Sequence, residues 1–170
     1  MDTPLDPSGT APALARWAEV RAAERVTRYI RLGAGRPVVV LQGAAREDDL
    51  WPELLGTIAA RCRVILPVAP EPDLSFGGWV RDFLDGLGLT PVALIAAGGY
   101  CAPALELALA DTDRVACVVL VPGAGDAGEL LALGQAAATR LLLLPREHPG
   151  WQAVARIERF IIPDAAREAR

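Results

Sequence analysis

Five short runs of apolar residues recur along this chain without any alternation of polar positions. They are rich in β-branched and aliphatic side chains and lie at 37–42, 63–69, 91–97, 115–121 and 140–144. Continuously apolar strands are typical of a parallel sheet whose two faces are both covered by helices. The pattern therefore predicts a buried, mostly parallel sheet.

Between these runs, apolar residues recur at the spacing of a helix face. The helical segments are 49–60, 78–87, 102–110 and 128–138. Strands that alternate with helices predict a doubly wound α/β sheet, because each helix returns the chain to the start of a parallel neighbour.

The two ends of the chain follow other patterns. Residues 15–22 and 24–32 alternate better and predict an antiparallel hairpin, whereas residues 1–12 are rich in Pro, Ser, Thr and Gly and are expected to be loose. Near the other end we expect a short helix over 149–156 and a last strand over 158–162. No internal repeat or long linker is evident, so residues 13–170 are expected to form a single domain.

Composition narrows the classes of function. The net charge is −4 and every basic residue is an arginine interspersed with acids, which argues against a nucleic-acid partner. The longest apolar runs reach about ten residues, too few for a membrane span. Three cysteines do not suggest a disulfide framework, so we expect a cytoplasmic protein. With a single histidine and no Cys-x-x-Cys pair, neither a metal nor another cofactor is expected.

The most informative stretch is 92–101, Val-Ala-Leu-Ile-Ala-Ala-Gly-Gly-Tyr-Cys, where a predicted strand meets a sharp turn and then a helix. It resembles the nucleophile elbow of the α/β-hydrolase fold superfamily, G-x-S-x-G, which holds a strained serine at the top of the sheet. Gly98 stands where that serine would be. The family typically has Arg-Val sixteen residues after its nucleophile, and Arg114-Val115 matches that spacing from Gly98.

The resemblance extends over about residues 15–167 and implies that other parts of the catalytic machinery are substituted too. Gln42-Gly43 stands where the family usually has the His-Gly of its oxyanion loop. His148 stands at the position of the catalytic acid, in Pro-Arg-Glu-His, and Arg167 at that of the catalytic base. The lid is reduced to 125–139, and the last helix of the family is missing.

This resemblance implies a small, lidless, degenerate α/β-hydrolase with a vestigial pocket in place of the active site. The residues expected to surround that pocket are Gln42, Gly43, Ala44, Gly98, Gly99, Tyr100, His148 and Arg167.

Cys101 offers an alternative nucleophile. Gly99-Tyr100-Cys101-Ala102-Pro103 is similar to the G-x-C-x-G elbow of dienelactone-hydrolase-like enzymes, and His148 is the only imidazole that could serve as its base. In the opposing interpretation, Cys101 lies in the first turn of the helix and packs as a small hydrophobic side chain. Tyr100 would either fill the emptied active site or line a pocket there.

Two classes of function follow from these patterns. The first is a non-catalytic protein that binds a small apolar ligand, a protein partner or a second copy of itself through surfaces that the missing lid and helix leave bare. The second is a repurposed enzyme, either a thioesterase-like protein with Cys101 and His148 or a catalyst of a non-hydrolytic step that uses Tyr100, Glu147 or His148 as acid or base.

Overall fold

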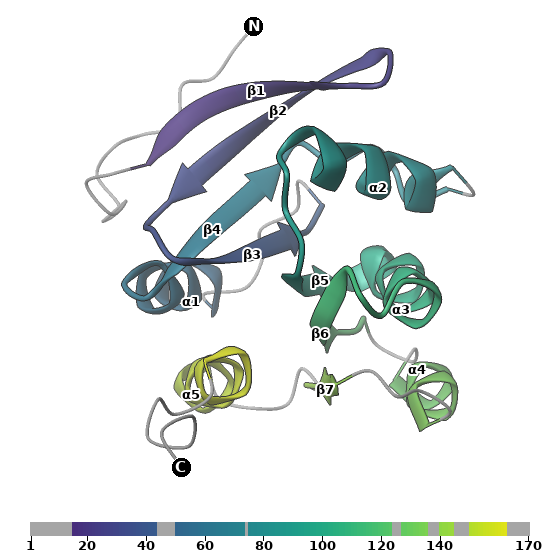
Figure 1. Cartoon of the computed structure of the whole chain (residues 1–170). Helices are drawn as coiled ribbons and strands as arrows, with labels where there is room; N and C mark the ends of the chain where they lie inside the picture. Colours follow the sequence, from purple (N-terminus) through teal and green to yellow (C-terminus); the bar gives the residue numbers. More distant parts are fainter. Residues whose placement is uncertain are drawn as a thin grey trace, which may run out of the picture.

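The computed structural model describes residues 15–43, 50–73, 75–123, 127–135, 140–144 and 150–162, and within them a sheet lies between two layers of helices (Figure 1). The strands are β1 (Arg16–Ala22), β2 (Arg25–Leu32), β3 (Arg36–Leu41), β4 (Cys62–Pro67), β5 (Val92–Ala97), β6 (Val115–Val121) and β7 (Arg140–Leu143). The helices are α1 (Leu50–Ala59), α2 (Phe76–Gly86), α3 (Cys101–Ala110), α4 (Ala127–Gln135) and α5 (Gly150–Ile161), and a single 3₁₀ turn, Gly98–Tyr100, precedes α3.

The described strands form one sheet in the order β1-β2-β4-β3-β5-β6-β7. The hairpin β1-β2 is antiparallel and joins β4 in antiparallel pairing, whereas all pairs from β4 to β7 are parallel. This topology confirms the predicted doubly wound sheet with an N-terminal hairpin.

The continuous apolar runs arise because both faces of the sheet are buried. Along β3, Val39 and Leu41 belong to the core shared with α2 and α3, while Val38 and Val40 belong to the core shared with α1 and α5. All four are at most 1% exposed. Figure 1 shows α1 and α5 on one face of the sheet and α2, α3 and α4 on the other. No helix of the described residues is long and apolar enough to cross a membrane.

The hairpin is held against α2 by both polar and apolar contacts. Buried Thr27 accepts a hydrogen bond at 3.1 Å from the indole N–H of Trp79, and Tyr29 meets Phe83 edge to face. Gly86 lets the helix approach the hairpin closely, since a Cβ there would lie 2.8 Å from a methyl group of Val20. The hairpin and α2 therefore form one packed unit beside the parallel part of the sheet.

Helix α2 ends in a Schellman arrangement that delivers the chain to β5. The Leu89 N–H bonds to the Leu84 carbonyl at 2.9 Å, and Gly88 adopts a left-handed φ of +62°. Such a residue after the last turn satisfies carbonyls that the helix itself leaves unpaired.

One element differs in kind from the prediction. The strand expected over 158–162 is wrong, because α5 continues through Ile161. Val154, Ile157 and Ile161 recur at helical spacing and are buried in the core shared with α1, whereas the prediction rested on the local β-preference of the last three apolar residues. No helix follows α5 within the described residues, and the expected loose segment 1–12 lies outside them.

Candidate functional site

The turn between β5 and α3 has the backbone geometry of a nucleophile elbow. Ala97 is extended, with φ −126° and ψ 146°, and Gly98 adopts a left-handed φ of +55° as the first residue of the 3₁₀ turn that leads into α3. A Cβ built on Gly98 meets no atom of the described residues within 4 Å beyond its chain neighbours. The backbone thus presents a position from which a side chain would project into open space, and this chain has no side chain there.

The carboxyl end of β3 lies beside this turn. Leu41 pairs with Ala96 of β5, so Gln42 and Gly43 continue along the same edge of the sheet. The side-chain oxygen of Gln42 is buried and has no hydrogen-bond partner among the described residues. A buried acceptor without a partner lowers the free energy of unfolding by about 1–3 kcal/mol. A group that donates a hydrogen bond to the Gln42 side chain would recover this cost.

Tyr100 fills space next to the turn. It is only 7% exposed, its ring lies 5.3 Å from that of Phe76, and a Cβ on Gly43 would be 3.8 Å from the ring. Its hydroxyl donates a hydrogen bond to the Pro70 carbonyl at 3.1 Å. Burial, with a smaller contribution from the charge of Glu71, raises the pKa of Tyr100 above its ordinary value. These contacts favour the interpretation in which Tyr100 packs into the core.

Cys101 lies inside α3 and not at the turn. It is the first residue of the helix, is 2% exposed, and its Sγ donates to the Ala96 carbonyl at 3.3 Å. The residue with left-handed φ is Gly98, three positions earlier. The elbow centred on Cys101 is therefore not formed, because its sulfur is directed into the core.

The spacing between the turn and Arg114 has a structural basis. Val92, at the start of β5, donates to the Arg114 carbonyl at 2.9 Å, and the Arg114 guanidinium binds Asp111 at 2.9 Å and also Asp85. These contacts join the start of β6 to the ends of α2 and α3, so the length of α3 sets the distance from Gly98.

Several predicted site residues lie outside the described residues, and their position relative to Gly98 stays a prediction. They are Ala44, Glu147, His148 and Arg167. Within the described residues, no three His, Cys, Asp or Glu side chains gather as metal ligands would.

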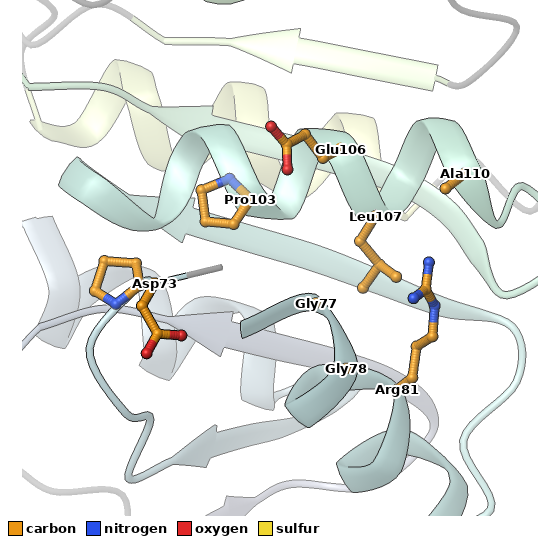
Figure 2. A pocket seen from close by; sticks show the side chains of 9 residues that line it. Asp73, Gly77, Gly78, Arg81, Pro103, Glu106, Leu107 and Ala110 are labelled. Carbon is orange, nitrogen blue, oxygen red and sulfur yellow. The ribbon is translucent and has the colours of Figure 1, made fainter. Parts of the chain in front are cut away.

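A groove of about 670 Å³ lies between α2 and α3, close to the turn but separate from it (Figure 2). Gly77 and Gly78 line it from α2, and Leu107 lines it from α3. In Figure 2 the side chain of Arg81 extends toward α3, whereas the Glu106 carboxylate points away from α2. Of the residues predicted for the vestigial pocket, none of those that the structure describes lines this groove.

No protein-family model matches the chain, and no curated protein matches its sequence. Solved structures do match, and the following three are enzymes of one fold. Carboxylesterase CesB from Bacillus subtilis has a TM-score of 0.56 at 17% identity over 65% of this chain and 44% of its own. The epoxide hydrolase CorEH has a TM-score of 0.55 at 19% identity over 66% of this chain and 46% of its own. The naproxen esterase of Bacillus subtilis has a TM-score of 0.57 at 17% identity over 75% of this chain and 52% of its own.

The chain has an α/β-hydrolase fold. It spans about half the length of these enzymes. The matched α/β-hydrolase structures carry names of different activities, so the shared fold does not by itself indicate a reaction.

One feature was not anticipated from the sequence. Three arginines, Arg140, Arg156 and Arg159, line a groove of about 310 Å³ between β7 and α5, together with Leu142 and Phe160. The sequence placed Arg140 in a strand, but the predicted strand over 158–162 separated Arg159 from Arg156. A helix predicted through residues 158–162 would have put Arg156 and Arg159 on one face, since residues three apart are neighbours on a helix.

Proposed function

We propose that this chain is a non-catalytic protein of α/β-hydrolase fold that acts as an interaction subunit. The observation that carries the proposal is Gly98, which has the left-handed backbone of an elbow nucleophile, open space around it and no side chain. Covalent catalysis by a triad needs a nucleophile within reach of a base, and glycine supplies none.

Two further points support the loss of catalysis. The sequence places His148 where the catalytic acid would stand, and an imidazole is not the carboxylate that this position requires. The match of Arg167 to the base depended on a strand over 158–162, where α5 instead continues through Ile161, and it no longer supports the proposal. The alternative with a catalytic thiol loses its support because Cys101 is buried and bonded to the Ala96 carbonyl.

A protein partner is favoured over a small apolar ligand in the vestigial pocket. Tyr100 occupies the space beside the turn and is hydrogen-bonded there. The groove between α2 and α3 and the groove beside β7 do not include Gly98 or Gly99. Binding through an outer surface therefore agrees better with the packing than binding at the turn.

The test is exposure of the purified chain to a fluorophosphonate probe and to p-nitrophenyl acetate, with an active serine esterase treated in parallel. We expect no labelling and no hydrolysis above that of buffer. Labelling at any residue would overturn the proposal.

A single substitution tests the wider loss of the triad. We expect Gly98→Ser to remain unlabelled, because a serine hydroxyl is a weak nucleophile without a base. Gly98→Ala serves as the matched control for the effect on stability. Recovery of esterase activity by Gly98→Ser alone would show that a working acid and base are present.

A further inference from the structure

The outer edge of β7 carries backbone groups without a strand partner among the described residues. The sheet order ends at β7, and the Leu144 N–H bonds to the Leu120 carbonyl of β6 at 2.9 Å. Because the N–H and C=O of one residue point to the same side of a strand and the side alternates, Leu142 also faces β6. The N–H and C=O groups of Leu141 and Leu143 therefore point away from the sheet.

The two edge strands of the described sheet, β1 and β7, differ in how well they are protected from pairing with an additional strand. β1 exposes the charged side chains of Arg16, Glu19 and Arg21, and charges of this kind discourage the addition of another strand. β7 reads Arg-Leu-Leu-Leu, and its three leucines are half-buried. Of the two edges, β7 is the one suited to pairing with an added strand.

The groove beside β7 carries several arginine side chains. Among the described residues that line it, every titratable side chain is an arginine: Arg140, Arg156 and Arg159. The Arg140 guanidinium donates to the Phe160 carbonyl at 2.8 Å and lies 5.0 Å from the centre of the Phe160 ring, so it is held beside the strand. An extended segment that pairs with β7 would lay half of its side chains over this groove.

The arginines beside β7 indicate which kind of strand can pair with this edge. A second copy related by a two-fold axis would bring these arginines against their own counterparts, which is unfavourable. Carboxylates would instead form charge-assisted hydrogen bonds with the guanidinium groups. Leu141 and Leu143 on the opposite face of β7 would contact apolar side chains of the added strand.

We propose that the β7 edge binds an extended segment of a second protein in which acidic and apolar residues alternate, and that this segment pairs with β7 as an added strand. This inference rests on the proposed role as an interaction subunit. It names the surface, the mode of pairing and the chemistry of the partner.

The probe is a fluorescein-labelled peptide of alternating valine and glutamate, seven residues long, and its control is the same peptide with lysine in place of glutamate. Fluorescence anisotropy with the full chain should show binding of the glutamate peptide. We expect the lysine peptide to bind at least about tenfold more weakly, equivalent to about 1.4 kcal/mol. Equal binding of the two peptides, or no binding of either, overturns the proposal.

Two pairs of variants locate the site. Leu143→Pro removes an outward N–H without removing a hydrogen bond to β6, so it should weaken peptide binding at least about tenfold, whereas Leu143→Ala keeps that N–H and loses only apolar contact, so it should weaken binding less. Arg159→Glu should weaken binding similarly, and Arg81→Glu on α2, with the same change in charge, should not. Circular dichroism verifies that each variant is folded, and the Arg159→Glu pair decides the question if Leu143→Pro is not.

The outcomes separate this inference from the proposed function. Loss of peptide binding with no fluorophosphonate labelling would refute the edge site and leave the non-catalytic role standing. A dimer in solution that Leu143→Pro dissociates would identify a second copy as the occupant and overturn the acidic partner.

Discussion

Replacement of Gly98 by alanine tests whether the turn requires a left-handed backbone conformation at this position, independently of steric contact by a side chain. The added Cβ meets no atom within 4 Å beyond its chain neighbours in the part of the chain that the structure describes, so steric overlap with the described elements contributes nothing. The cost arises from φ +55°, where a Cβ lies too close to the following carbonyl.

The expected magnitude is the difference between two effects. The left-handed conformation costs a residue with a Cβ about 1–2 kcal/mol. Alanine restricts the unfolded chain more than glycine does and recovers about 0.4–1 kcal/mol. We therefore expect Gly98→Ala to lower the free energy of unfolding by about 1 kcal/mol.

Two glycines in similarly open surroundings provide controls. Gly78 lies in helix α2 without a left-handed φ, so Gly78→Ala should raise the free energy of unfolding by about 0.5–1 kcal/mol. Gly88 has φ +62°, so Gly88→Ala should lower the free energy of unfolding as Gly98→Ala does.

The assay is urea unfolding followed by tryptophan fluorescence, with free energies from linear extrapolation and an unchanged m-value as a check. A Gly98→Ala variant that is as stable as the wild type, or that changes stability in the same direction as Gly78→Ala, would contradict a left-handed requirement at Gly98. Either result would mean that the turn does not demand a left-handed residue, and the assignment of Gly98 as the elbow position would lose its structural basis.

Three further predictions concern buried groups. Thr27→Val should lower the free energy of unfolding by about 1–3 kcal/mol, because it leaves the buried N–H of Trp79 without an acceptor, whereas Thr27→Ser should cost less in the same urea assay. Burial raises the pKa of Tyr100, so the unfolded chain loses the phenol proton at a lower pH than the folded chain does. The stability that this difference contributes is present below about pH 10 and should decline as the pH rises through the folded-state pKa. Tyr100→Phe should show a smaller decline in the free energy of unfolding between urea titrations at about pH 9 and 11. An equal decline in both proteins would contradict the burial of that phenol. All cysteines should react slowly with Ellman's reagent until the chain is unfolded, and a rapidly reacting native thiol at Cys101 would revive the thiol enzyme.

The sheet could be predicted because burial on two faces leaves a direct mark on the sequence. The run 37–42 has no polar position until Gln42, and it forms β3 with its side chains divided between two cores. The position of the turn could also be predicted from its resemblance to the family's elbow and from the family's spacing to Arg114, and the length of α3 explains that spacing. Both signals are local in the chain, so they need no knowledge of distant contacts.

The C-terminal segment shows where local preference fails. Phe160, Ile161 and Ile162 favour a strand by themselves, but Ile157 and Ile161 belong to the core beside α1 only as part of a helix. Burial of one helical face stabilises α5 more than the β-preference of three residues disfavours it.

The sequence by itself determined the fold class, the place of the elbow and the absence of a nucleophile side chain at Gly98. Only the tertiary structure decided that Tyr100 is bonded to Pro70, 30 residues earlier, that the Cys101 thiol is directed into the core, and that the β7 edge lies beside a cluster of arginines. The reason is physical. Backbone and periodicity signals depend on neighbours in the chain, whereas the filling of a pocket and the charge of a groove depend on side chains that meet only after the sheet and its helices have packed.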